Sequence, residues 1–95
     1  MKTDNILRSE MEKELKKELH SLALKTRDRL DLTQHEMADR YAMAESSYNM
    51  LEKGRYKCGT LITVLLLKDQ EDPKKTSEEL AEKLEKVRDE LMVSV

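Results

Sequence analysis

Apolar and polar residues follow one another at helical spacing along most of this 95-residue chain. The pattern is clearest over residues 32–54, where Thr33 and Glu36 have the T-x-x-E spacing of a capping box at a helix start. Apolar residues then recur at three- and four-residue steps, which predicts a short helix over residues 34–41. After a tight turn, the same spacing predicts a second helix over residues 44–53.

Two longer amphipathic segments flank this stretch. The first predicts one long helix over residues 1–31. The second follows a break at Asp72-Pro73 and predicts a helix that opens with a second capping box, Thr76 and Glu79. The apolar stripe of the first helix is Leu7, Met11, Leu15, Leu19 and Leu22. The heptad seam of the second helix is Leu80, Leu84, Val87 and Leu91.

Each stripe has two possible partners. The N-terminal stripe packs either on the C-terminal helix of the same chain or on another protein, and both alternatives stay open. The C-terminal seam docks either on the N-terminal helix or on the same seam of a second copy. We favour the second copy, which makes the four seam residues dimerisation residues in a homodimer.

Residues 60–69, TLITVLLLKD, are nearly all apolar. Their β-branched residues would suit a buried strand, but a lone strand has nothing to pair with in this chain. We therefore predict a helix that must be covered on most sides, which again favours a dimer. The expected fold is all-α, with about five helices in a single domain. Residues 1–20 form an extension, residues 21–70 a core and residues 73–95 a C-terminal helix.

The composition excludes several classes of protein. Charged residues make up 40% of the chain and Gly and Pro are scarce, which is typical of helical proteins. We expect a cytoplasmic protein, because no segment could span a membrane, the N-terminus is no signal peptide and Cys58 cannot form an internal disulfide. His20 and His35 lack metal-site spacing and no glycine-rich phosphate loop exists. We therefore expect no metal, no cofactor and no enzymatic activity.

Three features of residues 32–54 occur together. They are the T-Q-x-E-x-A pattern that begins at Thr33, the apolar Met43 at the turn, and the L-E-K-G ending at Gly54. This combination resembles the helix-turn-helix of the phage-repressor-like (Cro/Xre-type) DNA-binding family. The resemblance implies a lambda-repressor-like fold with an extended first helix and an added last helix. It also implies a homodimeric, sequence-specific transcriptional regulator of the repressor kind, with its second motif helix in the major groove of double-stranded DNA.

The resemblance also assigns the contacts to DNA. It implies that Gln34 bonds a phosphate. By their chemistry, Asn49 could pair with an adenine and Lys53 could bind a guanine or a phosphate. Arg55 and Lys57 follow the second helix and suit phosphates. The alternative is a solvent-facing side chain for Gln34, Asn49, Arg55 and Lys57, and a cation that interacts with the helix dipole for Lys53. The complete set of predicted DNA-binding residues is Gln34, Ala44, Glu45, Ser46, Asn49, Met50, Lys53, Arg55 and Lys57.

Three residues depart from the family pattern. Ala42 replaces the usual glycine of the turn, which is acceptable if its backbone angles are ordinary. Ala44 replaces the usual Ser or Thr cap of the second helix, a loss of about 1 kcal/mol. Tyr48 replaces a Val or Ile and needs a partner for its hydroxyl group if it is buried.

The net charge of −2 weighs against DNA binding, because phosphate contacts supply much of the affinity of such domains. A basic cluster beside the second helix could compensate. The competing hypothesis is a protein-interaction module that keeps the fold with little or no DNA binding, which Glu45 and an exposed Met50 favour. The cations expected in or near the cluster are Lys25, Arg27, Arg29, Arg40, Lys53, Arg55 and Lys57.

Overall fold

The structure is a computed structural model, and it describes residues 2–56 and 59–94. Within these ranges it contains five α-helices and no strand, so the predicted all-α fold is confirmed. The segment 60–69 is helical, as predicted. The helices are α1, Lys2–Leu30; α2, Gln34–Arg40; α3, Glu45–Glu52; α4, Thr60–Lys68; and α5, Pro73–Ser94.

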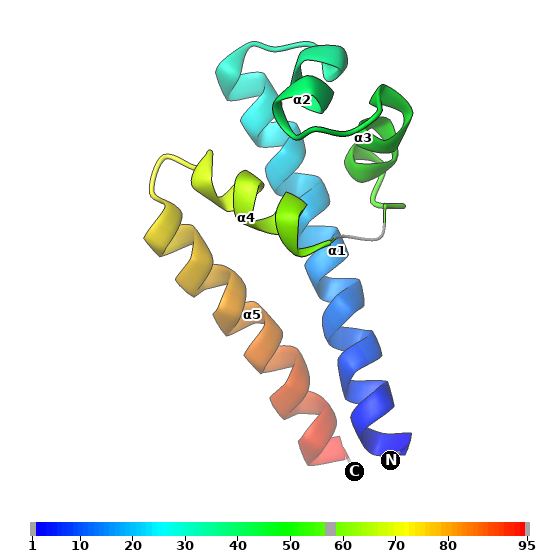
Figure 1. Cartoon of the computed structure of the whole chain (residues 1–95). Coiled ribbons are helices and arrows are strands. Elements are labelled where there is room, and N and C mark those ends of the chain that lie inside the picture. The colour runs from blue at the N-terminus through cyan, green and yellow to red at the C-terminus, as the bar shows by residue number, and fades with distance from the viewer. Residues whose placement is uncertain (1, 57–58, 95) are drawn as a thin grey trace.

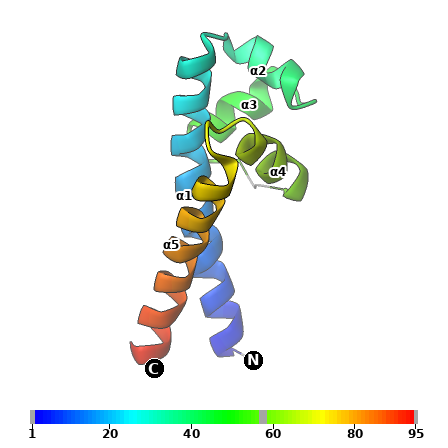
Figure 2. The same cartoon turned by 90° about the vertical axis from the view of Figure 1, so that its left-hand side faces the viewer.

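The five helices form a head and a stem (Figure 1). In the head, α2, α3 and α4 gather around the C-terminal half of α1. Helix α5 then runs back beside α1 in the opposite direction, so both ends of the chain lie at the far end of the stem (Figures 1 and 2). We define the stem as residues 5–15 of α1 and 84–93 of α5. The molecule is elongated, measuring 44 × 27 × 18 Å along its principal axes.

The core lies in the head and is organised by two tyrosines, since the chain has no Phe or Trp. Tyr41 follows α2 and Tyr48 lies in α3; both are buried, and their rings stack with centroids 6.3 Å apart. This distance is within the range at which aromatic rings attract one another, so the pair holds α2 and α3 together. The buried neighbours of the pair are Leu19, Ala23, Met37, Ala38, Leu51, Ile62 and Leu66.

The stripe of α1 packs on α5 of the same chain, which is one of the two alternatives that the sequence left open. Leu80 is buried in this contact, and Lys83 Nζ donates a hydrogen bond to Glu18 Oε2 over 2.9 Å. The same-chain contact covers the rest of the seam only in part, so dimerisation through it stays a prediction. The half-buried seam residues are Leu84, Val87 and Leu91.

Helix α5 begins at the predicted boundary of the C-terminal segment, before the capping box that was expected to open it. The Asp72 carboxylate accepts a hydrogen bond of 3.1 Å from the backbone N–H of Lys75, so Asp72 caps the helix and Pro73 is its first residue. Proline suits this position because an N–H there would have no partner within the helix. The predicted capping box of Thr76 and Glu79 is therefore wrong, since both residues lie inside α5.

Helix α4 is less covered than its apolar sequence led us to expect. Ile62 and Leu66 enter the core, whereas Leu61 and Val64 are 61% and 56% exposed. The uncovered residues form one side of the helix and leave an apolar strip on the surface of the head.

The turn between α2 and α3 is strained at one residue. Ala42 has a φ of 54°, in the left-handed region that favours glycine, so its backbone angles are not ordinary.

We predict that Ala42→Gly raises the free energy of unfolding by about 0.5–1 kcal/mol, measured by urea unfolding. The control Ala81→Gly, inside α5, should lower it by about 1 kcal/mol. A loss of stability in Ala42→Gly would contradict this account of the turn.

Candidate nucleic-acid interface

The predicted capping box at the start of α2 is present. The backbone N–H of Glu36 donates to Thr33 Oγ1 over 3.1 Å, and the backbone N–H of Thr33 donates to Glu36 Oε1 over 3.0 Å. Leu32 packs against the core that holds the buried Met37, as a hydrophobic staple requires. The start of α2 is thereby fixed, and with it the position of Gln34.

The turn leads into α3 without a side-chain cap. The N–H of Met43 donates to the Ala38 carbonyl over 3.0 Å, and the Met43 side chain packs against the core. Ala44 is the N-cap of α3 and makes no side-chain hydrogen bond, as the alanine there led us to expect. Helix α3 is therefore held by its inner face rather than by its cap.

A buried carboxylate joins α1, α2 and α3. The Glu52 side chain is only 5% exposed. Arg27 of α1 donates to it twice, over 2.5 and 3.1 Å, and the side-chain amide of Gln34 of α2 donates over 3.0 Å. A buried charge needs such partners, because unpaired it would cost several kcal/mol.

Hydrogen bonds keep Glu52 ionised. Burial by itself would raise the pKa of the Glu52 carboxyl group, but the hydrogen bonds from Arg27, Gln34 and Tyr48 outweigh it and hold the pKa below its usual value. The Tyr48 hydroxyl also lies 3.4 Å from the carbonyl oxygen of Ala23, so this buried tyrosine has the partner that the sequence required. Burial, with the neighbouring carboxylate, raises the pKa of Tyr48.

The sequence missed this network. Glu52 entered the prediction only as a letter of the L-E-K-G ending, and Arg27 as a possible neighbour of the basic cluster. One signal was available: Glu52 follows Leu51 and lies four positions after Tyr48, which places it on the inner face of α3.

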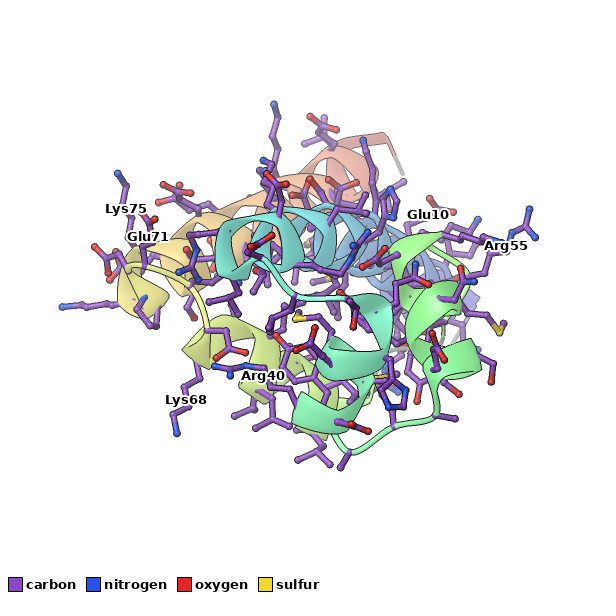
Figure 3. The ribbon with its side chains drawn as sticks, turned by 90° about the horizontal axis from the view of Figure 1, so that it is seen from above. Glu10, Arg40, Arg55, Lys68, Glu71 and Lys75 are labelled. Atoms are coloured by element: carbon purple, nitrogen blue, oxygen red, sulfur yellow. The ribbon has the colours of Figure 1, made fainter. Side chains whose placement is uncertain are left out.

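Most of the predicted base-contacting side chains come together on the outer face of α3, which we define as Glu45, Ser46, Asn49, Met50 and Lys53. Asn49 is half-buried, and the other four are exposed. Ala44, just before the helix, is also exposed, and Arg55 projects outward beyond its end (Figure 3). Lys57 lies outside the described residues, as does Cys58.

The arginines expected to extend the basic cluster are used elsewhere. Arg27 binds Glu52, as described. Arg40 donates to both carboxylate oxygens of Asp69 over 2.7 and 2.5 Å, and Arg29 donates to the Asp69 carbonyl oxygen. Lys25 lines a polar cleft between α1 and the start of α5. Among the residues that the structure describes, the cations left beside α3 are Lys53 and Arg55.

Asp69 is the centre of a second polar network, which closes the C-terminal end of α4. The hydroxyl of Tyr41 also donates to its carboxylate, over 2.8 Å. The hydrogen bonds from Arg40 hold the pKa of the Asp69 carboxyl group below its usual value. This network explains why Arg40 points away from Arg55 in Figure 3.

Glu45 lies close to a histidine, a neighbour that the sequence did not predict. His35 of α2 places Nε2 at 3.5 Å from an Asp39 oxygen and Nδ1 at 3.7 Å from a Glu45 oxygen. Glu45 also lies in the first turn of α3, where a carboxylate interacts favourably with the helix dipole. The acidic residue at this predicted contact position is therefore accommodated within the motif itself.

Comparisons with models of known protein families, with curated proteins and with solved structures find no match to this chain. The assignment to the Cro/Xre-type family thus stays a prediction that rests on the motif residues. Within the described ranges, no helix is both long and apolar enough to cross a membrane.

The networks of Glu52 and Asp69 predict loss of stability in acid. The pKa values of Glu52 and Asp69 are lowered by folding from ordinary values of 4.5 and 3.8, so their contribution is complete above about pH 4.5 and is lost as the pH falls through the lowered values. Glu52→Gln should cost about 2 kcal/mol at pH 7 because Arg27 loses its charged partner. Its curve of unfolding free energy against pH should also be flatter than that of the native chain. Parallel curves for the two proteins would refute the role given to Glu52.

Proposed function

We propose that this chain is a sequence-specific DNA-binding regulator of transcription that acts as a homodimer and places α3 in the major groove. The observation that supports the proposal most is the division of α3 into two faces. Tyr48, Leu51 and Glu52 anchor the inner face, while the outer face carries exposed side chains that can bond base edges. A helix held in this way can enter a groove without rearranging.

The proposed contacts divide into those that position the protein and those that read sequence. Lys53 and Arg55 bind phosphates at the C-terminal end of α3, and the second amide N–H of Gln34 is free for another phosphate, since the first donates to Glu52. Asn49 pairs with an adenine, and the 46% exposed Met50 contacts a thymine methyl group.

Two further contacts complete the proposed interface. Ser46 bonds a base or a phosphate, and Glu45 accepts a hydrogen bond from a cytosine amine. A two-fold dimer would place its two α3 helices about 34 Å apart on one side of the duplex. Regulation would then come from expression, proteolysis or a partner protein, and the site of action would be the cytoplasm.

The competing proposal, a protein-interaction module with this fold, gains support from the electrostatics. Three arginines expected near the basic cluster are engaged within the chain: Arg27 and Arg40 by the carboxylates of Glu52 and Asp69, and Arg29 by the Asp69 carbonyl oxygen. Met50 is an exposed apolar residue at the centre of the outer face, which suits a protein partner as well as a thymine methyl group. Neither proposal requires catalysis.

Binding to random-sequence duplex DNA separates the two proposals. With Lys53, Arg55 and Lys57 as the phosphate-binding cations of each copy, the logarithm of the affinity should fall with the logarithm of salt concentration with a slope of about −3 per copy. The double variant Lys53→Ala/Arg55→Ala should weaken binding to all sequences and remove most of this slope, measured by fluorescence anisotropy. The control Lys86→Ala, an exposed cation of α5, should change neither. Absent or salt-insensitive binding of the native chain would favour the protein-interaction module.

Asn49 should carry sequence preference rather than general affinity. Selection of binding sites from random oligonucleotides should give a site with one adenine that Asn49→Ala no longer prefers, at a cost of about 1–3 kcal/mol on that site. Asn5→Ala, at an exposed asparagine of α1, is the matched control and should keep the native preference. An unchanged preference profile for Asn49→Ala would remove Asn49 from the interface.

A further inference from the structure

The stem leaves its apolar residues incompletely covered. Beyond the head, α1 and α5 have only each other to pack against, because α2, α3 and α4 lie at the other end (Figures 1 and 2). Two helices alone bury one narrow strip of each, and the remainder of each stripe faces water. The half-buried apolar residues of the stem are Leu7, Met11, Leu15, Leu84, Val87 and Leu91.

A hollow of about 230 Å³ opens on this surface between the two helices. Met11 and Leu15 of α1 and Leu84 of α5 supply its apolar walls, while Arg8 and Glu12 supply its charged ones. Its volume is sufficient for a large apolar side chain. In packed helices, such a hole between neighbouring residues receives a side chain from a facing helix.

From these features we infer that the stem binds the stem of a second copy in the antiparallel sense, so that two helix pairs form one four-helix bundle. The inference rests on the dimeric part of the proposed function and specifies its surface. The bundle combines the α5 seam with the α1 stripe, and the hollow of each copy receives an apolar side chain of the other. The two heads lie at opposite ends of this bundle.

Charge favours a second copy over a different partner. Arg8 and Glu12 are one helical turn apart, so antiparallel pairing of two α1 helices brings Arg8 of each copy opposite Glu12 of the other. The stem as a whole carries four positive and six negative residues, and both signs occur on each helix. A strongly acidic partner would be repelled by this surface, whereas an identical stem aligned in this way pairs opposite charges at Arg8 and Glu12.

The area of the stem surface determines how strongly two copies are expected to associate. About ten residues of each helix, at 1.5 Å per residue and about 10 Å in width, give a face of roughly 15 × 20 Å per copy. This area is below that of standard stable complexes, so the dissociation constant should be roughly 10–100 µM. Binding to adjacent sites on DNA would add to this weak affinity.

The mass of the chain without DNA tests the inference directly. Sedimentation equilibrium of the full chain from about 5 to 500 µM should show the mass rising from the 11.1 kDa of a monomer towards twice that value. Arg8→Glu and Glu12→Arg each oppose like charges across the two-fold axis, and each should weaken association roughly ten-fold.

An equimolar mixture of the two single variants is the decisive sample. In a mixed pair, both contacts across the axis again join opposite charges, so the mixture should associate as strongly as the native chain. Effects of the substitutions on the stability of the individual chains cannot produce this result, because each chain in the mixture still carries its single substitution.

Met11→Trp gives an independent test: by filling the hollow it should raise the melting temperature and weaken association.

The matched control is the other exposed apolar strip. Leu61→Lys/Val64→Lys changes α4 and should leave the association unchanged. A monomer at every concentration, an unaltered dimer in all the stem variants, or loss of the dimer in the α4 control would each overturn the inference. DNA binding is measured separately in the salt series, so a monomer that binds DNA would refute the stem dimer and leave the DNA-binding proposal standing.

Discussion

The arrangement of the head depends on the hydrogen bonds that the buried carboxylate of Glu52 accepts. It is buried at the end of α3 and accepts hydrogen bonds from Arg27 of α1 and Gln34 of α2. A single ionised group thus links the three helices that surround the turn. Apolar packing is non-directional and could tolerate several orientations of such short helices. The fixed geometry of a paired guanidinium and carboxylate tolerates far fewer.

This arrangement has a consequence for the surface. Arg27 and Arg40 are paired with the carboxylates of Glu52 and Asp69, and Arg29 donates to the Asp69 carbonyl oxygen, so all three are engaged within the head. The outer face of α3 has Lys53 and Arg55 beside it, within a chain of net charge −2. Under the proposed function, contacts to bases would therefore matter more than they would beside a cluster that kept all of these arginines.

The sequence predicted the local features of the fold well. The capping box of Thr33 and Glu36, the second motif helix and the helical state of residues 60–69 all follow from periodicity and short-range chemistry. The capping box predicted for α5 was wrong because two capping signals stand close together in the sequence. Asp72 and Pro73 come first along the chain and start the helix, so Thr76 lies inside the helix and cannot cap it.

Other features could not be predicted because they depend on residues far apart in sequence. The pairs Arg27–Glu52 and Arg40–Asp69 join positions that no periodicity relates, so arginines expected near the basic cluster prove to be bound within the chain. The left-handed backbone of Ala42 is likewise imposed by the packing of α2 against α3, since alanine has no preference for it. For the candidate site, the sequence located the outer face of α3 but not the carboxylate that holds it.

The most direct test of the account is a titration of ¹⁵N-labelled chain with a duplex obtained by site selection, followed through the backbone amide signals. The account predicts that the largest shifts fall on Gln34 and on the outer face of α3, from Glu45 to Lys53, while the Glu52 environment keeps its native hydrogen bonds. Shifts confined to α4 or the stem, or no shifts at low salt, would contradict it.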